Sequence, residues 1–360
     1  MNPRTNFYSS QEFNNLIQTR HSNSDKLSIL HLNIRGVRNK FDALKDYLNP
    51  LDNKFTIIAL TETWLNNNDY DNFEIPGYKS TKLLRQNKIG GGICIFSRVD
   101  LKFNLRNDLV FEDDTDDTEN LFIEIINEKS NNIITGTIYR PPNNRFNKFE
   151  NNLKTILTKL DKCNKPCYIM GDFNIDLLKY NYCNFSTEFF NQFSSSGHTP
   201  LITKPTRITK STATLIDNIF TNNLSKMEHL NGTLLHDISD HFPIFTITDH
   251  ELQNCPKTPK IDDCTTRIIT KKSLEAFCCE IENCDWQSTL SKNDPTESCT
   301  AFFKDFFELY DKFFPMKKYK SKRSNNLWIS KGLKKSSKTK EVYTENLQRI
   351  RVKKLNEIIK

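Results

Sequence analysis

Polar residues of several kinds stand at the ends of short apolar runs, where a strand could aim them from the adjoining loop. Asn33 and Glu62 each follow such a run. A carboxylate there is a hard oxygen ligand suited to Mg²⁺, and an amide could bind a metal or a phosphate oxygen. Asp172 and Asn174 follow a third run and can share one face of an extended segment. One could then take a proton while the other donates to a developing oxyanion.

Three more clusters extend this pattern. Tyr139 and Arg140 follow another apolar run, and a phenol with a guanidinium suits a phosphate. Asp217 lies inside an apolar run, where a buried acid needs a partner that is often a histidine. Asp240 and His241 supply an acid and an imidazole side by side. Each cluster alone also fits a structural role, such as a surface acid or a tyrosine packed on proline; together, in this order, they favour a catalytic site.

The elements that must position these residues alternate between strands and helices. The predicted strands are 27–32, 55–60, 93–96, 121–126, 133–139, 167–170, 215–220 and 242–247, and the predicted helices are 40–48, 148–160 and 186–194. Strands mixed with helices in this way predict an α/β or α+β sandwich.

The composition changes after residue 249. Residues 251–259 contain two prolines and few apolar residues, which is typical of a linker. A phenylalanine-rich helix is predicted over 301–314, where Pro315 ends it, and a basic helix over the last residues. The predicted organisation is an N-terminal segment (1–26), a main domain (27–249), a linker (250–262) and a helical basic extension (263–360).

Positive charge is concentrated in that extension. The net charge of +7 divides into −1 for residues 1–250 and +8 for residues 251–360. Lys317, Lys318, Lys320 and Arg323 are candidates for contact with a phosphate backbone, because clustered Lys and Arg attract polyanions. A solvated helical face or a nuclear-import patch would explain the same charges.

Composition also excludes several classes of protein. The apolar runs are far shorter than the roughly 18 residues of a membrane helix, and the N-terminus lacks the apolar stretch of a signal peptide. Ten cysteines without a repeating framework indicate a reducing compartment. We therefore expect an intracellular protein, in the nucleus, the cytoplasm or both, with no membrane partner.

The ordered clusters resemble the endonuclease/exonuclease/phosphatase superfamily over about residues 27–248. They are most similar to the endonuclease of non-LTR, LINE-type retrotransposons of the jockey kind. The matching segments are 31–35, 61–65, 90–93, 139–142, 171–175, 205–207, 215–222 and 239–241. The segment after residue 285 also resembles the one that such polyproteins place before a reverse transcriptase.

The resemblance implies a four-layer sandwich of two mixed sheets with helices outside. It also implies one site for Mg²⁺, or for Mn²⁺ in its place, at the edge of the sheets. Glu62 would be the metal ligand, with Asn33 and Asp240 close to the metal or its waters. Arg35 stands where repair-type abasic-site nucleases carry an acid. This departure lowers the ligand count and argues against a repair enzyme.

The remaining roles also follow from the resemblance. Asp172 would orient or deprotonate the attacking water, and Asn174 and His241 would stabilise the transition state. Asp217 would hold the tautomer of His241. Tyr139 would contact the scissile phosphate, with Arg140 nearby.

The implied reaction is hydrolysis of duplex DNA that leaves a free 3′-hydroxyl to prime reverse transcription. Element RNA is a second expected partner. The reverse transcriptase is expected in cis, and because the chain ends within a helical pattern we expect a truncated or partial product. Two other functions stay open: a phosphoesterase of the same fold acting on a lipid or small-molecule phosphate, and a catalytically silent relic that only binds nucleic acid.

Overall fold

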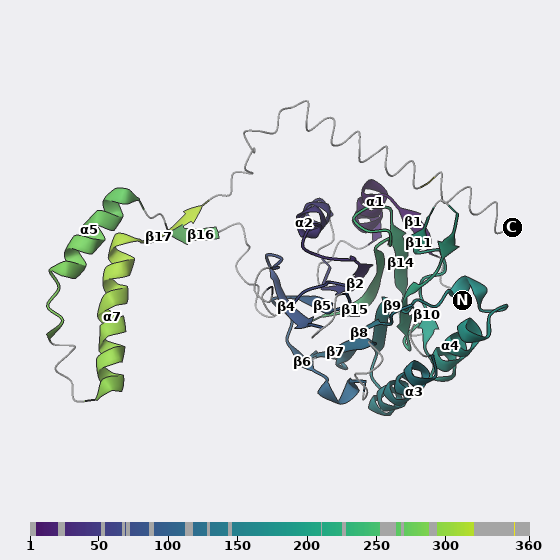
Figure 1. Ribbon diagram of the computed structural model, residues 1–360. Helices are drawn as coiled ribbons and strands as arrows, with labels where there is room; N and C mark the ends of the chain where they lie inside the picture. The colour runs from purple at the N-terminus through teal and green to yellow at the C-terminus, as the bar shows by residue number, and fades with distance from the viewer. Residues whose placement is uncertain are drawn as a thin grey trace. The chain divides into compact units, whose positions relative to one another are not determined.

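The computed structural model describes residues 5–20, 26–51, 55–66, 69, 73–85, 90–111, 118–127, 130–142, 146–209, 211–224, 228–252, 264–267, 270–287, 294–319 and 349. The chain divides into two compact units (Figure 1). Unit 1 comprises Met1–Cys255 with Leu333–Lys360, and unit 2 comprises Pro256–Gly332. Each unit is described by itself.

The larger sheet of unit 1 contains, among the described residues, seven strands in the order β1-β14-β15-β2-β3-β5-β4. Their bounds are β1 (Asn6–Tyr8), β14 (His229–Leu234), β15 (Ile244–Glu251), β2 (Lys26–Asn33), β3 (Ile57–Thr61), β5 (Ile93–Arg98) and β4 (Tyr78–Leu83). β1 runs parallel to β14 and β2 runs parallel to β3, while the other neighbours are antiparallel, so the sheet is mixed.

The second sheet has the order β10-β13-β9-β8-β7-β6 over the same described part of the chain. Its strands are β10 (Thr199–Pro200), β13 (Asp217–Thr221), β9 (Cys167–Asp172), β8 (Ile133–Tyr139), β7 (Glu119–Ile125) and β6 (Phe103–Leu105). Here β8 and β9 are parallel and the remaining pairs are antiparallel. A short ribbon of β11 (Arg207–Ile208) and β12 (Ala213–Thr214) stands apart from both sheets.

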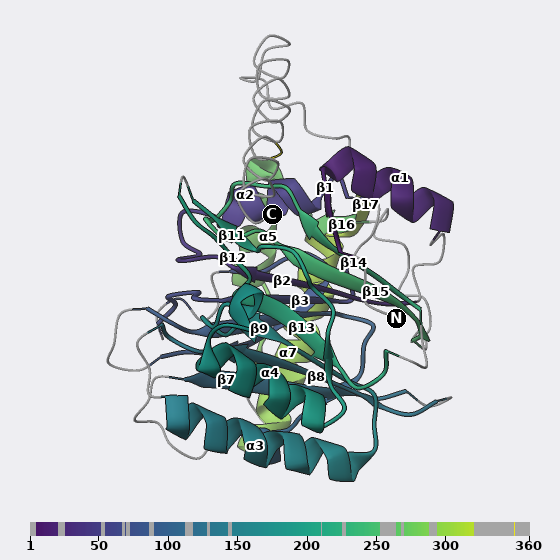
Figure 2. The same cartoon turned by 90° about the vertical axis from the view of Figure 1, so that its right-hand side faces the viewer.

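Helices cover the outer faces of the two sheets, which makes four layers (Figure 2). The helices are α1 (Ser10–Arg20) and α2 (Phe41–Leu48) over the first sheet, and α3 (Phe146–Cys163) and α4 (Asn184–Ser195) over the second. Alternation along β2 explains the layering: Leu30 and Leu32 pack with α1 and α2, while Leu27 and Ile29 join the core between the sheets. The predicted fold class is therefore confirmed.

Every predicted strand and helix of the main domain overlaps an observed element. In unit 1, the strands and α-helices not predicted from the sequence are α1, β1, β4, β6, β14 and the two-residue strands β10, β11 and β12. Of these, β1 and α1 lie in the predicted N-terminal segment. The predicted linker falls almost entirely on residues that the structure does not describe, after β15 ends at Glu251.

Unit 2 contains a helical pair and a small antiparallel ribbon. Its elements are β16 (Cys264–Arg267), α5 (Lys271–Glu282), α7 (Pro295–Phe313) and β17 (Met316–Tyr319). Buried Phe277 of α5 contacts the rings of Phe306, Tyr310 and Phe314, with centroids 5.0–5.9 Å apart. The aromatic run thus forms the contact between the two helices. Helix α7 begins at Pro295 instead of at the predicted residue 301, because the Asp294 side chain caps its N-terminus.

Candidate active site

The ends of two pairs of parallel strands, one pair in each sheet, meet the beginning of a fifth strand at one edge of the sheets. β2 and β3 end at Asn33 and Thr61, and β8 and β9 end at Tyr139 and Asp172. β13 runs antiparallel to β9, so its first residue, Asp217, pairs with Asp172. Strand direction alone therefore gathers residues from distant parts of the chain.

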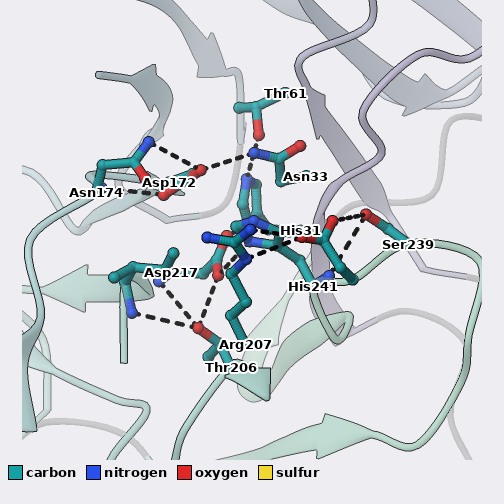
Figure 3. A network of polar contacts seen from close by, with 12 residues as sticks. His31, Asn33, Thr61, Asp172, Asn174, Thr206, Arg207, Asp217, Ser239 and His241 are labelled. Atoms are coloured by element: carbon teal, nitrogen blue, oxygen red, sulfur yellow. Dashed lines mark hydrogen bonds and ion pairs between the residues drawn. The ribbon is translucent and has the colours of Figure 1, made fainter. Parts of the chain in front are cut away.

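The amide of Asn33 joins two carboxylates. Its Nδ2 donates to Asp172 Oδ2 at 2.7 Å (Figure 3) and to Glu62 Oε1 at 2.9 Å. Asn33 is fully buried. Its Oδ1 accepts from the backbone N–H of Arg35. The indole N–H of Trp64 donates to the other oxygen of Glu62 at 3.3 Å. Glu62 is thus fixed at both oxygens, with Asp172 on the far side of the same amide.

His241 is fixed by Asp217. The Nδ1 of His241 lies 2.9 Å from Asp217 Oδ2, and the Thr206 hydroxyl donates to that same oxygen at 2.7 Å. All three residues are buried. Because Asp217 occupies Nδ1, Nε2 is the ring nitrogen that can face a substrate.

A second histidine stands on the other side of Asp217. His31 Nδ1 lies 4.0 Å from Asp217 Oδ1, and His31 Nε2 lies 3.2 Å from the Thr61 hydroxyl. Within the described residues, neither His31 Nδ1 nor Asp217 Oδ1 has a hydrogen-bond partner. Burial lowers the pKa of His31 to about 4, so this imidazole is neutral at physiological pH.

The two aspartates have opposite pKa shifts. Burial, joined by the charge of Asp217, raises the pKa of Asp172 well above its usual range. Burial acts on Asp217 in the same sense, but the charge and hydrogen bond of His241 outweigh it and hold the pKa of Asp217 below its usual value. Neighbouring acids whose pKa values are driven apart can take different roles in proton transfer.

His241 holds its proton. Burial by itself would lower the pKa of His241, but the charge and hydrogen bond of Asp217, with the charges of Asp172 and Asp240, raise it to about 9. The imidazolium is therefore a cationic donor at neutral pH.

The loop after β9 holds Asn174 against Asp172. The backbone N–H of Asn174 donates to Asp172 Oδ1 at 3.0 Å, and its Nδ2 donates to the carbonyl of Arg140 at 2.8 Å. Asn174 adopts a left-handed conformation, with φ 49°. Gly171 is required just before, because a Cβ there would lie 1.8 Å from the carbonyl oxygen of Ile138.

Tyr139 and Arg140 are consecutive at the end of β8, but their side chains have different neighbours. Tyr139 is buried beside Glu62; burial, then the charges of Glu62 and Asp172, raise its pKa far above the usual value, so its hydroxyl stays protonated. Arg140 is only 5% exposed, and its guanidinium lies 5.6 Å from the ring centroid of Phe149. This placement does not support the predicted contact of Arg140 with DNA, which stays a prediction.

Asp240 is paired with two arginines. Arg35 Nη1 lies 2.7 Å and Arg207 Nε lies 2.9 Å from Asp240 Oδ2. Of the three residues predicted to bind the metal, Asn33 and Glu62 contact each other, whereas Asp240 is hydrogen-bonded to the two arginines. Its predicted part in metal binding therefore stays a prediction.

Residues 30–241 match the model of the endonuclease/exonuclease/phosphatase family. The match spans more than half of the chain. The protein belongs to this family. The enzymes of the family are hydrolases that act on phosphodiester bonds.

Several solved structures are similar to this chain. The AP endonuclease LMAP from Leishmania major is 15% identical over 65% of this chain and 90% of its own, with a TM-score of 0.53. The catalytic domain of Xenopus laevis APE2 is 18% identical over 64% and 94%, with a TM-score of 0.49. The endonuclease domain of TRAS1, a telomere-specific non-LTR retrotransposon, is 14% identical over 62% and 99%, with a TM-score of 0.47. No curated protein matches the sequence.

Enzymes of this family are typically dependent on a divalent metal. In the part of the chain that is described, ligand atoms of Asp172, Asp217 and His241 lie within 4.8 Å of one another and could hold an ion. Asp217 and His241 are already bonded to each other, however, whereas Glu62 and Asp172 present carboxylate oxygens on either side of Asn33. An oxygen-rich set of this kind fits a hard divalent cation.

The basic residues predicted to contact nucleic acid lie in unit 2. Lys317 and Lys318 belong to β17, where only the backbone is described, and Lys320 and Arg323 lie outside the described residues. Among the described helices, none combines the length and apolar composition needed to cross a membrane.

Sequence reasoning assigned no role to four residues that contact the site: His31, Trp64, Thr206 and Arg207. All four fall within segments of the family resemblance: His31 in 31–35, Trp64 in 61–65, and Thr206 and Arg207 in 205–207. A polar residue inside an otherwise apolar strand is the signal that could have identified His31.

Proposed function

We propose that this protein is a Mg²⁺-dependent DNA endonuclease, the nicking enzyme of a non-LTR retrotransposon. It would hydrolyse one phosphodiester and leave a 3′-hydroxyl. The observation that supports this most is the convergence of a proton acceptor, Asp172, and a protonated donor, His241, at one buried edge of the sheets.

Asp172 is the base in this proposal. Its raised pKa favours accepting a proton from an attacking water, and the Asn33 amide and the Asn174 backbone N–H hold its two oxygens in place. The proton passes to the Asp172 carboxylate as the water oxygen attacks phosphorus. The bond between phosphorus and the 3′-oxygen breaks, and that oxygen leaves as the 3′-hydroxyl with a proton from solvent.

His241 is the charged donor. Asp217 holds the imidazolium through Nδ1, which leaves the Nε2 proton for an oxygen of the phosphate. The Tyr139 hydroxyl and the Asn174 amide, which in the structure donates to Arg140 and Asp172, would turn to the phosphate as further donors. Loss of one such donor typically costs about 10²–10³ in rate.

Glu62 would hold the metal ion, with Mn²⁺ as a substitute for Mg²⁺. Asn33, which contacts both Glu62 and Asp172, would lie close to the ion or its waters. When bound, the ion would neutralise charge on the phosphate oxygens and orient the phosphate. Trp64 supports this role, because its N–H restrains the Glu62 oxygen that Asn33 leaves unbonded.

The choice of DNA and of a retrotransposon rests on sequence. The segments 139–142 and 215–222 are the most particular to that branch of the superfamily, and positive charge is concentrated after residue 312. Duplex DNA is the proposed substrate, element RNA a second partner of the basic extension, and a reverse transcriptase the proposed partner in cis.

The direct test is the chemistry of the product end. A labelled duplex is incubated with the full chain in Mg²⁺ or EDTA, and the products are offered to a DNA polymerase. We expect Mg²⁺-dependent cleavage whose product is extended without prior phosphatase treatment. The control is Asp42→Ala, which removes an exposed carboxylate of α2, and it should cleave like the wild type.

Two other results would reject the proposal. Hydrolysis of an inositol phosphate without cleavage of duplex DNA would favour the small-molecule phosphoesterase. Binding of DNA without cleavage in Mg²⁺ would favour the silent relic.

A further inference from the structure

Asp240 lies between two guanidinium groups that come from distant parts of the chain. Arg35 Nη1 and Arg207 Nε both approach Oδ2 of Asp240, and Arg207 Nη2 lies 2.8 Å from the same oxygen. We call Arg35, Asp240 and Arg207 the Arg–Asp–Arg group.

This group borders the proposed catalytic residues. The backbone N–H of Arg35 donates to Asn33 Oδ1, and Asp240 directly precedes His241 in the chain. Arg207 pairs with His241 in an isolated antiparallel bridge, and its side chain extends toward the same centre (Figure 3). A ligand of His241 would therefore lie next to these guanidinium groups.

Unlike the buried residues behind it, the group is open to solvent. The side chains of Arg35, Asp240 and Arg207 are 43%, 34% and 36% exposed, whereas Asp217 and His241 are almost completely buried. Two cations on one anion leave a net charge of +1. Within the described residues, Asp240 accepts from one nitrogen of Arg35 and two of Arg207, and a guanidinium carries five N–H donors. Donors and charge thus remain for a second anion.

We infer that Arg35 and Arg207 bind a backbone phosphate of the substrate next to the scissile one, with Asp240 as the positioning residue that orients them. This inference rests on the proposed function. A planar guanidinium matches the paired oxygens of a phosphodiester, and two that are already oriented lose little freedom on binding. A metal ion on Asp240 would be repelled by both arginines.

The test measures how affinity for a labelled DNA duplex depends on salt, using the full chain in EDTA, where the metal-dependent reaction is absent. The variants are Arg35→Gln, Arg207→Gln and the charge-preserving Arg35→Lys. Each lost phosphate contact should reduce the slope of log affinity against log salt by about 1. Arg35→Lys should keep the wild-type slope.

Arg98→Gln is the matched control. Arg98 also pairs with a carboxylate, that of Asp100 at 2.6 Å, but it is the last residue of β5, at the edge of the sheet opposite the site. Its slope should equal that of the wild type, and thermal melting of each variant checks that it folds. Wild-type slopes in both Arg35→Gln and Arg207→Gln would overturn the inference, even if the wild type nicks DNA. A wild type that never cleaves DNA would instead contradict the proposed function, whatever the slopes.

Discussion

At the scale of single residues, the proposed chemistry depends on two neighbouring aspartates, Asp172 and Asp217, whose pKa values are shifted in opposite directions. Asp172 and Asp217 are paired across β9 and β13, yet only Asp217 is bonded to His241. Asp217 therefore stays ionised beside the imidazolium of His241, and Asp172 is the aspartate that can accept a proton. Burial favours the neutral form of both acids, because a charge without a partner is costly away from water, and only Asp217 has the bonded cationic partner that outweighs this effect.

This arrangement predicts the alkaline limb of the pH–rate profile. The rate should fall as pH rises through about 9, because His241 then loses its proton. Asp217→Asn removes the charge that holds this proton, so the alkaline limb should move toward 6.5, the ordinary pKa of histidine, along with a large loss of rate. The measurement is the nicking rate of both proteins between neutral and alkaline pH. An unchanged alkaline limb in Asp217→Asn would contradict the assignment.

The same pKa predicts how stability varies with pH. The folded-state pKa of His241 lies above its ordinary value, so its protonation stabilises the fold fully below pH 6.5. That stabilisation is lost as pH rises through about 9. Urea unfolding across this range should show a smaller loss in His241→Asn than in the wild type; equal losses would show that another group is responsible.

At the scale of elements, the strands with a local apolar or β-branched pattern were predicted from the sequence, whereas a strand that depends on contacts with distant residues was missed. β8 is rich in isoleucine and threonine, β9 begins with four apolar residues, and both were found. β14 was missed because it contains Asn231 and Gly232, residue types that are depleted in strands. Gly232 is needed there because a Cβ would lie 2.5 Å from the Tyr8 ring and 2.6 Å from the Phe245 ring.

The same distinction applies to the site. Residues that follow apolar runs, such as Asp172 and Glu62, were identified because their position in the chain predicts their position in the sheet. The pairing of Arg35 with Asp240 joins residues 205 positions apart, so no local pattern could predict it.

Gly171 offers a test of how the elements meet at the site. Gly171→Ala should destabilise the protein by about 3 kcal/mol or more, because the new Cβ would collide with the backbone of β8 and force β8 and β9 apart. Gly197→Ala is the control: its φ is +71° but nothing lies within 4 Å, so only backbone strain of about 1–2 kcal/mol is expected. Urea unfolding of both variants gives the comparison. Equal destabilisation would contradict the close approach at Gly171.

In the whole molecule, chemistry and charge belong to different parts of the chain. The proposed catalytic residues all lie in unit 1, within the segment that matches the family. The net charge of residues 1–250 is −1, and that of residues 251–360 is +8. A polyanionic substrate would therefore gain most of its nonspecific attraction from a part of the chain that performs no chemistry.

A chain that ends after Leu252 tests this division. It retains all strands of both large sheets, so cleavage should persist, but its affinity for DNA should fall and depend less on salt. Affinity is measured with the same duplex at several salt concentrations. Equal affinity of the two chains at every concentration would refute the role of the extension.

The most direct test of the account is plasmid nicking by the full chain and by Asp172→Ala. Supercoiled plasmid is incubated in Mg²⁺ and in EDTA, and the open circle is quantified on a gel. We expect conversion by the wild type only in Mg²⁺, no conversion by Asp172→Ala, and an unchanged melting temperature in the variant. Nicking by Asp172→Ala at the wild-type rate would contradict it.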